Sequence, residues 1–221
     1  MNASPLIPKP IVDSLGRSTT KWVRPDEDRS TDRLSSAPTL ASSHIKAELK
    51  GEHSTAFENR FISINMVPSE YGSFNTVKSG SGTGSAVVIS NARGEIMMVS
   101  QNRYAVGEKN WEIPRGGAAS EEDRSEAAQR EVKEETGIDL PLASIVSLGN
   151  IHPDTGILST EAGLFYAATE QDGNGDSDDI GEIADRQWFP ADDVVNACVD
   201  GTIKDSFTTT AILRARMRGF I

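Results

Sequence analysis

The spacing of apolar positions changes along this chain, and each spacing predicts a different element. Alternating apolar and polar residues at 57–67 predict a strand, and the Gly- and Ser-rich stretch 71–84 predicts a turn-rich connection. Two continuous apolar runs follow at 85–90 and 95–104, separated by turn formers at 91–94. The pattern therefore predicts a hairpin of two buried strands at the heart of a sheet.

Helical character first appears behind this hairpin. The charged stretch 121–136 predicts a helix, and Gly137 directly after it is a typical C-cap. The remaining patterns predict strands at 144–151, 163–170 and 186–189 and helices at 190–201 and 206–219. Because strands and helices are interspersed, the chain is expected to have an α+β fold.

The first part of the chain has a different texture. Residues 1–55 are rich in Ser, Thr, Pro and charge and have few apolar clusters, which predicts a loosely ordered polar arm that is either partly disordered or in contact with a dimer partner. Residues 56–221 carry all the patterns described above and are expected to form one domain.

Composition and charge narrow the class of protein. The chain has 37% hydrophobic and 25% charged residues, as ordinary soluble domains do. It has neither an apolar stretch near the ~18 residues of a membrane span nor a secretory signal, so we expect a cytoplasmic protein without a membrane partner. The net charge of −11 argues against nucleic-acid binding and indicates that a phosphate ligand would arrive with metal ions.

Three carboxylates mark the candidate chemistry. On a helix, Glu131, Glu134 and Glu135 fall within an arc of roughly 100°. Like charges at this spacing destabilise an isolated helix, so a cation is expected beside them, and oxygen ligands favour Mg²⁺ or Mn²⁺. The alternative for three acidic residues alone is a solvated helix face.

The residues around these carboxylates decide between the two interpretations. The chain has a glycine, a glutamate after five residues, and an Arg-Glu pair after seven more, followed by the rest of the pattern GX5EX7REUXEEXGU. The nine fixed positions are occupied by Gly116, Glu122, Arg130, Glu131, Val132, Glu134, Glu135, Gly137 and Ile138. This stretch resembles the Nudix box, and the resemblance implies a Nudix α/β/α sandwich with a mixed sheet.

The resemblance also implies roles for the box residues. Glu131, Glu134 and Glu135 would bind the metal ions, helped by the backbone carbonyl of Arg115. Arg130 and Glu122 would form an ion pair that holds these carboxylates in place. The catalytic residues that the box would supply are Glu134 and the two members of this ion pair, Arg130 and Glu122.

The substrate expectation depends on residues outside the box. The approach to the box, 100–117, is similar to that of ADP-ribose pyrophosphatases, which implies substrate contacts for Arg103 and Glu112. Pro153, sixteen residues after Gly137, matches a proline that lies beside the terminal ribose in that subfamily. The chain departs from the subfamily at Arg115, where alanine is usual, and at 152–154, where Ser-Pro-Gly is usual.

A catalytic base and a homodimer complete what the resemblance implies. In ADP-ribose pyrophosphatases a glutamate on a mobile loop often activates the attacking water, which here favours Glu182, with Asp178 and Asp179 as alternatives. A solvated acidic loop is the other interpretation of 172–182. The rival functions are a nucleoside triphosphate or dinucleoside polyphosphate hydrolase and a non-catalytic Nudix nucleotide sensor.

Overall fold

We describe the fold from a computed structural model of the chain. The described residues are 7–12, 18–23, 52–80, 82–119, 121–173 and 183–221. The chain divides into two compact units, Met1–Ala47 and Glu48–Ile221, and each is considered by itself.

The N-terminal unit contains a β-hairpin. Strands β1 (Ile7–Val12) and β2 (Ser18–Val23) pair antiparallel, with Pro8 opposite Trp22. The composition of 1–55 did not predict these strands. Both prolines of β1 lie in a two-stranded sheet, where each strand has a free edge that tolerates a residue without an N–H donor.

The larger unit is built on a seven-stranded mixed sheet, as expected. Its central order is β10-β11-β6-β7-β12, with β8 paired to β7 and β9 paired to β6. Strands β6 and β11 run parallel, and the other pairs are antiparallel. The strands are β6 (Thr83–Asn91), β7 (Glu95–Arg103), β8 (Glu108–Glu112), β9 (Arg115–Gly117), β10 (Val146–Ile151), β11 (Glu161–Thr169) and β12 (Ile183–Pro190).

The predicted hairpin is only partly correct. The turn between β6 and β7 exists, but the two strands share one register pair, Ser90 opposite Ile96. Farther from the turn, β6 pairs with β9 and β7 pairs with β8. The sheet is therefore split between its two central strands at the end where β8 and β9 lie.

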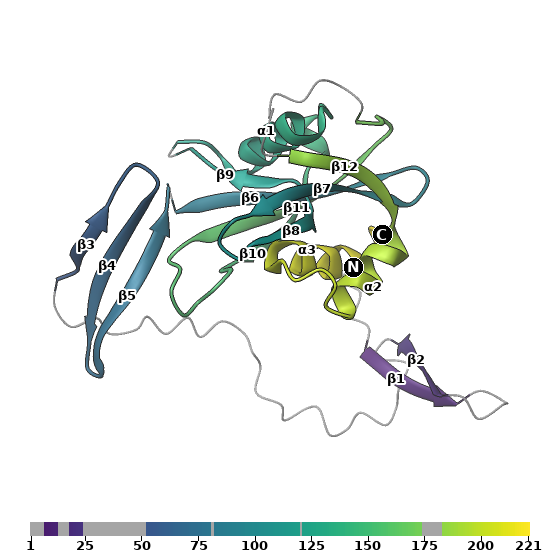
Figure 1. Cartoon of the computed structure of the whole chain (residues 1–221). Helices are drawn as coiled ribbons and strands as arrows, with labels where there is room; N and C mark the ends of the chain where they lie inside the picture. Colours follow the sequence, from purple (N-terminus) through teal and green to yellow (C-terminus); the bar gives the residue numbers. More distant parts are fainter. Residues whose placement is uncertain (1–6, 13–17, 24–51, 81, 120, 174–182) are drawn as a thin grey trace. The chain divides into compact units, whose positions relative to one another are not determined.

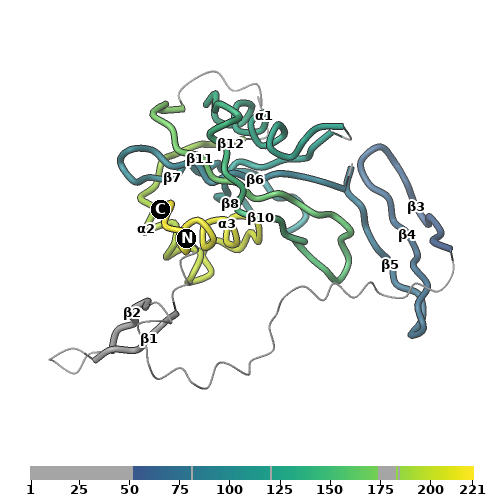
Figure 2. Tube along the Cα trace, turned by 180° about the vertical axis from the view of Figure 1, so that it is seen from behind, coloured from purple at the N-terminus to yellow at the C-terminus, as the bar shows by residue number. Residues whose placement is uncertain are grey.

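Helices cover both faces of this sheet. Helix α1 (Arg124–Thr136) lies on one face, and α2 (Ala191–Val199) and α3 (Ser206–Met217) lie on the other (Figures 1 and 2). In β6, Val87 and Ile89 belong to the apolar cluster under α1, whereas Ala86 and Val88 belong to the cluster under α2 and α3. The central strands are buried on both sides, which explains their continuous apolar runs. The α/β/α sandwich is confirmed.

The ends of α1 follow from its sequence. Asp123 caps its N-terminus and forms a capping box with Glu126, so the helix begins three residues later than the charged stretch suggested. Gly137 ends the helix in the left-handed region, with φ of 71°. None of the helices in the described ranges combines the length and apolar character of a membrane-spanning helix.

A second sheet of three strands precedes the sandwich in the chain. It consists of β3 (Ser54–Glu58), β4 (Ile62–Ser69) and β5 (Gly72–Ser79). The predicted single strand at 57–67 is therefore parts of two strands, and most of the predicted connection at 71–84 is β5. Backbone hydrogen bonds join the sheet to 157–159, since Val77 N donates to Ile157 O at 2.8 Å and Ser159 N donates to Val77 O at 3.0 Å.

Candidate active site

A cavity opens at the split between β6 and β7. It has a volume of about 440 Å³, within the range of small-ligand sites. Strands β6, β7 and β9, helix α1 and the start of α3 contribute to its wall. The side chains and backbone that line it belong to Ser79, Thr83, Gly84, Ser85, Gln101, Arg103, Arg115, Gly116, Gly117, Glu131, Glu134, Glu135, Thr160, Ala162 and Phe207.

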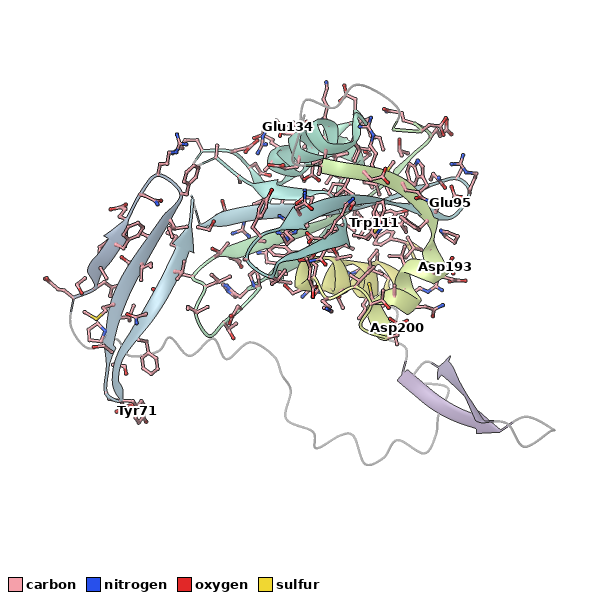
Figure 3. All side chains as sticks on the ribbon, viewed as in Figure 1. Tyr71, Glu95, Trp111, Glu134, Asp193 and Asp200 are labelled. Atoms are coloured by element: carbon pink, nitrogen blue, oxygen red, sulfur yellow. The ribbon has the colours of Figure 1, made fainter. Side chains whose placement is uncertain are left out.

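The three box carboxylates lie together on this wall. Glu131 and Glu135 are buried, at 8% and 3% exposure, while Glu134 is half-buried and is labelled on α1 in Figure 3. The carboxylate of Glu131 occupies the space that a Cβ atom at position 116 would need. Gly116 therefore makes room for Glu131, a reason for the glycine that the spacing of the box does not show.

Arg130 is the centre of a carboxylate network. Its Nε donates to Glu122 Oε1 at 2.9 Å, and its Nη1 donates to both Glu131 and Glu134 at 2.8 Å. Its Nη2 donates to the Gly117 carbonyl at 2.7 Å. The hydrogen bond with Glu122 is the main cause that raises the pKa of Arg130, and it lowers the pKa of Glu122 in turn. The pair expected from the box is present, and it reaches two of the box glutamates as well.

Glu135 is held from the opposite side. Gln101 Nε2 donates to Glu135 Oε1 at 2.6 Å, and the backbone N–H of Arg115 donates to Glu135 Oε2 at 3.1 Å. Gln101 lies in the stretch 100–117, and the sequence implied no role for it. Its amide fixes the orientation of a buried carboxylate, a contact between residues 34 positions apart that only the fold creates.

The donor set suits a hard divalent cation. Carboxylate and backbone oxygens of Glu131, Glu134, Glu135 and Arg115 are the ligands that Mg²⁺ and Mn²⁺ prefer. Within the described ranges, no three acidic, His or Cys side chains surround one metal position. Arg130 Nη1 donates to both Glu131 and Glu134.

A second network of charges lies beside the carboxylates. Arg103 binds Glu112 through Nε and Nη2, at 2.9 and 2.6 Å, and Arg115 Nε binds the same carboxylate at 2.8 Å. Arg115 also forms an ion pair with Asp205 at 3.3 Å, and its guanidinium lies 4.5 Å above the ring of Phe207. Burial would raise the pKa of Glu112, but the two arginines outweigh burial and lower it.

Other predicted site residues lie elsewhere. Glu112 is only 1% exposed and does not line the cavity; its carboxylate binds Arg103 and Arg115, and a substrate contact for it stays a prediction. Pro153 is half-buried and is not part of the lining either. Glu182, Asp178 and Asp179 lie outside the described residues. Sequence reasoning missed Phe207, which lines the cavity, and Asp205, which pairs with Arg115, because only the packing of α3 brings them to this site.

Two known proteins match parts of this chain in sequence. The chain is 27% identical to Nudix hydrolase 5 of Arabidopsis thaliana over 145 residues, which are 63% of this chain and 46% of that protein. It is 38% identical to the RNA pyrophosphohydrolase of Marinomonas sp. (strain MWYL1) over 53 residues, 24% of this chain and 30% of that protein. The matched part thus spans less than half the length of these relatives.

A solved structure shares the fold. The crystal structure of an ADP compounds hydrolase matches with a TM-score of 0.60 at 15% identity, covering 77% of this chain and 95% of that one. The model of the NUDIX domain matches residues 81–208, which is more than half of this chain. The chain therefore belongs to the Nudix family.

Proposed function

We propose that this chain is a metal-dependent hydrolase that splits the pyrophosphate of ADP-ribose or a related nucleoside diphosphate sugar. The products would be a nucleoside monophosphate and a sugar phosphate. The observation that carries the proposal is one cavity that combines three box carboxylates with two arginines. The fold is also that of a protein described as an ADP compounds hydrolase.

The box carboxylates are proposed to bind the metal. Glu131, Glu134 and Glu135, with the carbonyl of Arg115, would hold Mg²⁺ or Mn²⁺, which when bound neutralises phosphate charge and makes water a better nucleophile. Arg130, itself held by Glu122, positions Glu131 and Glu134. Gln101 fixes Glu135 by donating to one of its oxygens.

The remaining residues orient the substrate. Arg103 faces the same cavity and would neutralise charge on the phosphates, and Glu112 holds its guanidinium in place. Glu182 is proposed to take the proton of the attacking water, and Pro153 to lie near the terminal ribose. Hydrolysis then breaks one P–O bond, and the bridging oxygen leaves with the other product.

The test is activity with and without metal. We expect hydrolysis of ADP-ribose to require Mg²⁺ or Mn²⁺, and Glu135→Gln to lower kcat by several orders of magnitude because a buried ligand charge is lost. Glu121→Gln, an exposed position outside the fixed residues of the box, is the matched control. Full turnover in excess EDTA would contradict the proposal.

A substrate panel tests the rival activities. ADP-ribose should be cleaved with higher kcat/KM than ATP, GTP or diadenosine polyphosphates, since polar contacts to the terminal ribose discriminate. Because one relative is an RNA pyrophosphohydrolase, 5′-triphosphate RNA belongs in the panel. A triphosphate ranked first would replace the ADP-ribose assignment. Nucleotide binding without any turnover would instead support the sensor.

The proposal also covers the domain bounds, the cellular compartment, the oligomeric state and the partners of the enzyme. Residues 56–221 would be the hydrolase domain and 1–55 the arm, with the chain acting in the cytoplasm as a homodimer. A small nucleotide is the expected partner, with no nucleic acid and no membrane.

A further inference from the structure

Two cavity arginines share one buried carboxylate. Arg103 lies at the end of β7 and Arg115 begins β9, and both use Nε and Nη2 to bind Glu112. Among the described residues, neither Nη1 donates a hydrogen bond. Both side chains line the cavity, at 29% and 21% exposure. Each guanidinium thus has one end fixed and one end available.

Arg115 is held on three sides. Beside Glu112, it contacts Asp205 at 3.3 Å and lies over the ring of Phe207 at 4.5 Å. Asp205 is itself fixed, because it caps α3 by accepting from the Thr208 N–H at 2.8 Å. A guanidinium held in this way loses little conformational entropy when it binds an anion.

Glu112 also keeps the arginines away from the metal carboxylates. Glu135 lines the same cavity as Arg103, and it accepts the backbone N–H of Arg115. An arginine released from Glu112 could pair with Glu135, as Arg130 pairs with Glu131 and Glu134. Because Glu112 binds Nε and Nη2 of both arginines, these atoms are not available to Glu135.

We propose that Arg115 is a second phosphate-binding side chain, and that with Arg103 it forms a paired anion site for the diphosphate chain of the substrate. Glu112 is the positioning residue of this pair. The place of the site in catalysis rests on the proposed function. Arg115 thereby determines specificity for a diphosphate chain, which offers several oxygens to two fixed donors.

The experiment measures binding of imidodiphosphate, a non-hydrolysable diphosphate without a nucleoside, to the full chain with Mg²⁺ by calorimetry. Loss of charge-assisted hydrogen bonds predicts that Arg115→Ala weakens binding roughly 10- to 100-fold. Arg115→Lys should recover part of the affinity, because it keeps the charge but not the planar contact with Glu112. Arg93→Ala removes an exposed arginine outside the cavity and should change nothing.

Two further measurements keep the outcomes distinct. Mg²⁺ binding without diphosphate should be unchanged in Arg115→Ala, because only the backbone of Arg115 is assigned to the metal. Thermal unfolding checks the fold, and Arg115→Gln, which keeps more of the packing on Phe207, replaces the alanine variant if that variant unfolds.

The result that overturns the inference is a folded Arg115→Ala or Arg115→Gln variant that binds imidodiphosphate within twofold of the unmodified chain. This holds even if ADP-ribose is the substrate. If ADP-ribose is not hydrolysed but the variants still lose imidodiphosphate affinity, the proposed function fails and the anion site stands.

Discussion

At the scale of single residues, the site depends on space as much as on charge. A Cβ atom at position 116 would lie much closer than 3.0 Å to the Glu131 carboxylate, and real Cβ atoms essentially never approach another heavy atom that closely. Gly116→Ala should therefore move this carboxylate. Because the group is the end of a flexible side chain, we expect the fold to survive while Mg²⁺ affinity and kcat fall, as calorimetry and kinetics can show.

The neighbouring glycine provides the comparison for this variant. A Cβ atom at Gly117 meets nothing within 4 Å. Gly117→Ala should therefore weaken Mg²⁺ binding much less than Gly116→Ala does. Equal losses in the two variants would mean that backbone freedom, and not space for Glu131, is what the first glycine supplies.

Glu112 should make the free energy of unfolding depend on pH, and the sign of this dependence follows from its contacts. Its pKa is lowered in the folded state by Arg103 and Arg115 against the effect of burial. The stabilisation is present above the unfolded pKa of about 4.3 and is lost as pH falls through the lower folded value. Glu112→Gln should cost about 2 kcal/mol near neutral pH, a loss that disappears in acid because the protonated glutamate is also neutral.

Denaturant unfolding at several pH values measures this effect. The free energies of unfolding of the unmodified chain and Glu112→Gln should converge below the ordinary glutamate pKa of about 4.3. A difference that stays constant down to strongly acidic pH would show that Glu112 stabilises by shape and not by charge.

At the scale of elements, α1 carries the box carboxylates between two defined ends. Gly137 ends the helix with φ of 71°, where a side chain is strained. Gly137→Ala should lower the free energy of unfolding by roughly 1 to 2 kcal/mol, and Gly137→Asn by less, because asparagine tolerates this conformation better. Thermal or denaturant unfolding checks both. Equal stability of all three proteins would contradict the cap.

The proposed base, Glu182, belongs to the segment of the chain between β11 and β12. Glu182→Gln should lower kcat by roughly 10² to 10⁴ with a smaller change in KM, the usual size for a positioned base. Steady-state kinetics of ADP-ribose hydrolysis provides the measurement. Impairment of Asp178→Asn or Asp179→Asn instead would move the role along the loop, and three active variants would return it to a box glutamate such as Glu134.

At the scale of the whole molecule, we predict that two copies of the chain associate. The β3–β5 sheet exposes large apolar side chains at Phe57, Phe61, Met66, Tyr71 and Phe74, and Figure 3 shows Tyr71 at the end of the β4–β5 hairpin. Association of two chains would remove apolar surface from water. Light scattering should give twice the chain mass of 23.8 kDa, and the mass of one chain would contradict the homodimer.

The features that could be predicted from the sequence depend on interactions between residues that are close along the chain. The period of a helix puts Glu131, Glu134 and Glu135 on one face, and glycine at 137 permits the left-handed turn that ends it. The apolar runs of β6 and β7 follow from burial on both faces. These features require only neighbours a few residues away or a generic buried environment. The amino-acid sequence is therefore enough to predict them.

Only the tertiary structure decided the contacts between distant segments. The split between β6 and β7, the strand β5 and the hairpin β1–β2 depend on hydrogen-bond partners that turn-rich sequence does not reveal. The spacing along the chain does not show that Arg103 and Arg115 share the carboxylate of Glu112. Burial makes the difference, because a carboxylate inside a protein needs charged or hydrogen-bonding partners, and their positions are set by the packing of the whole sheet.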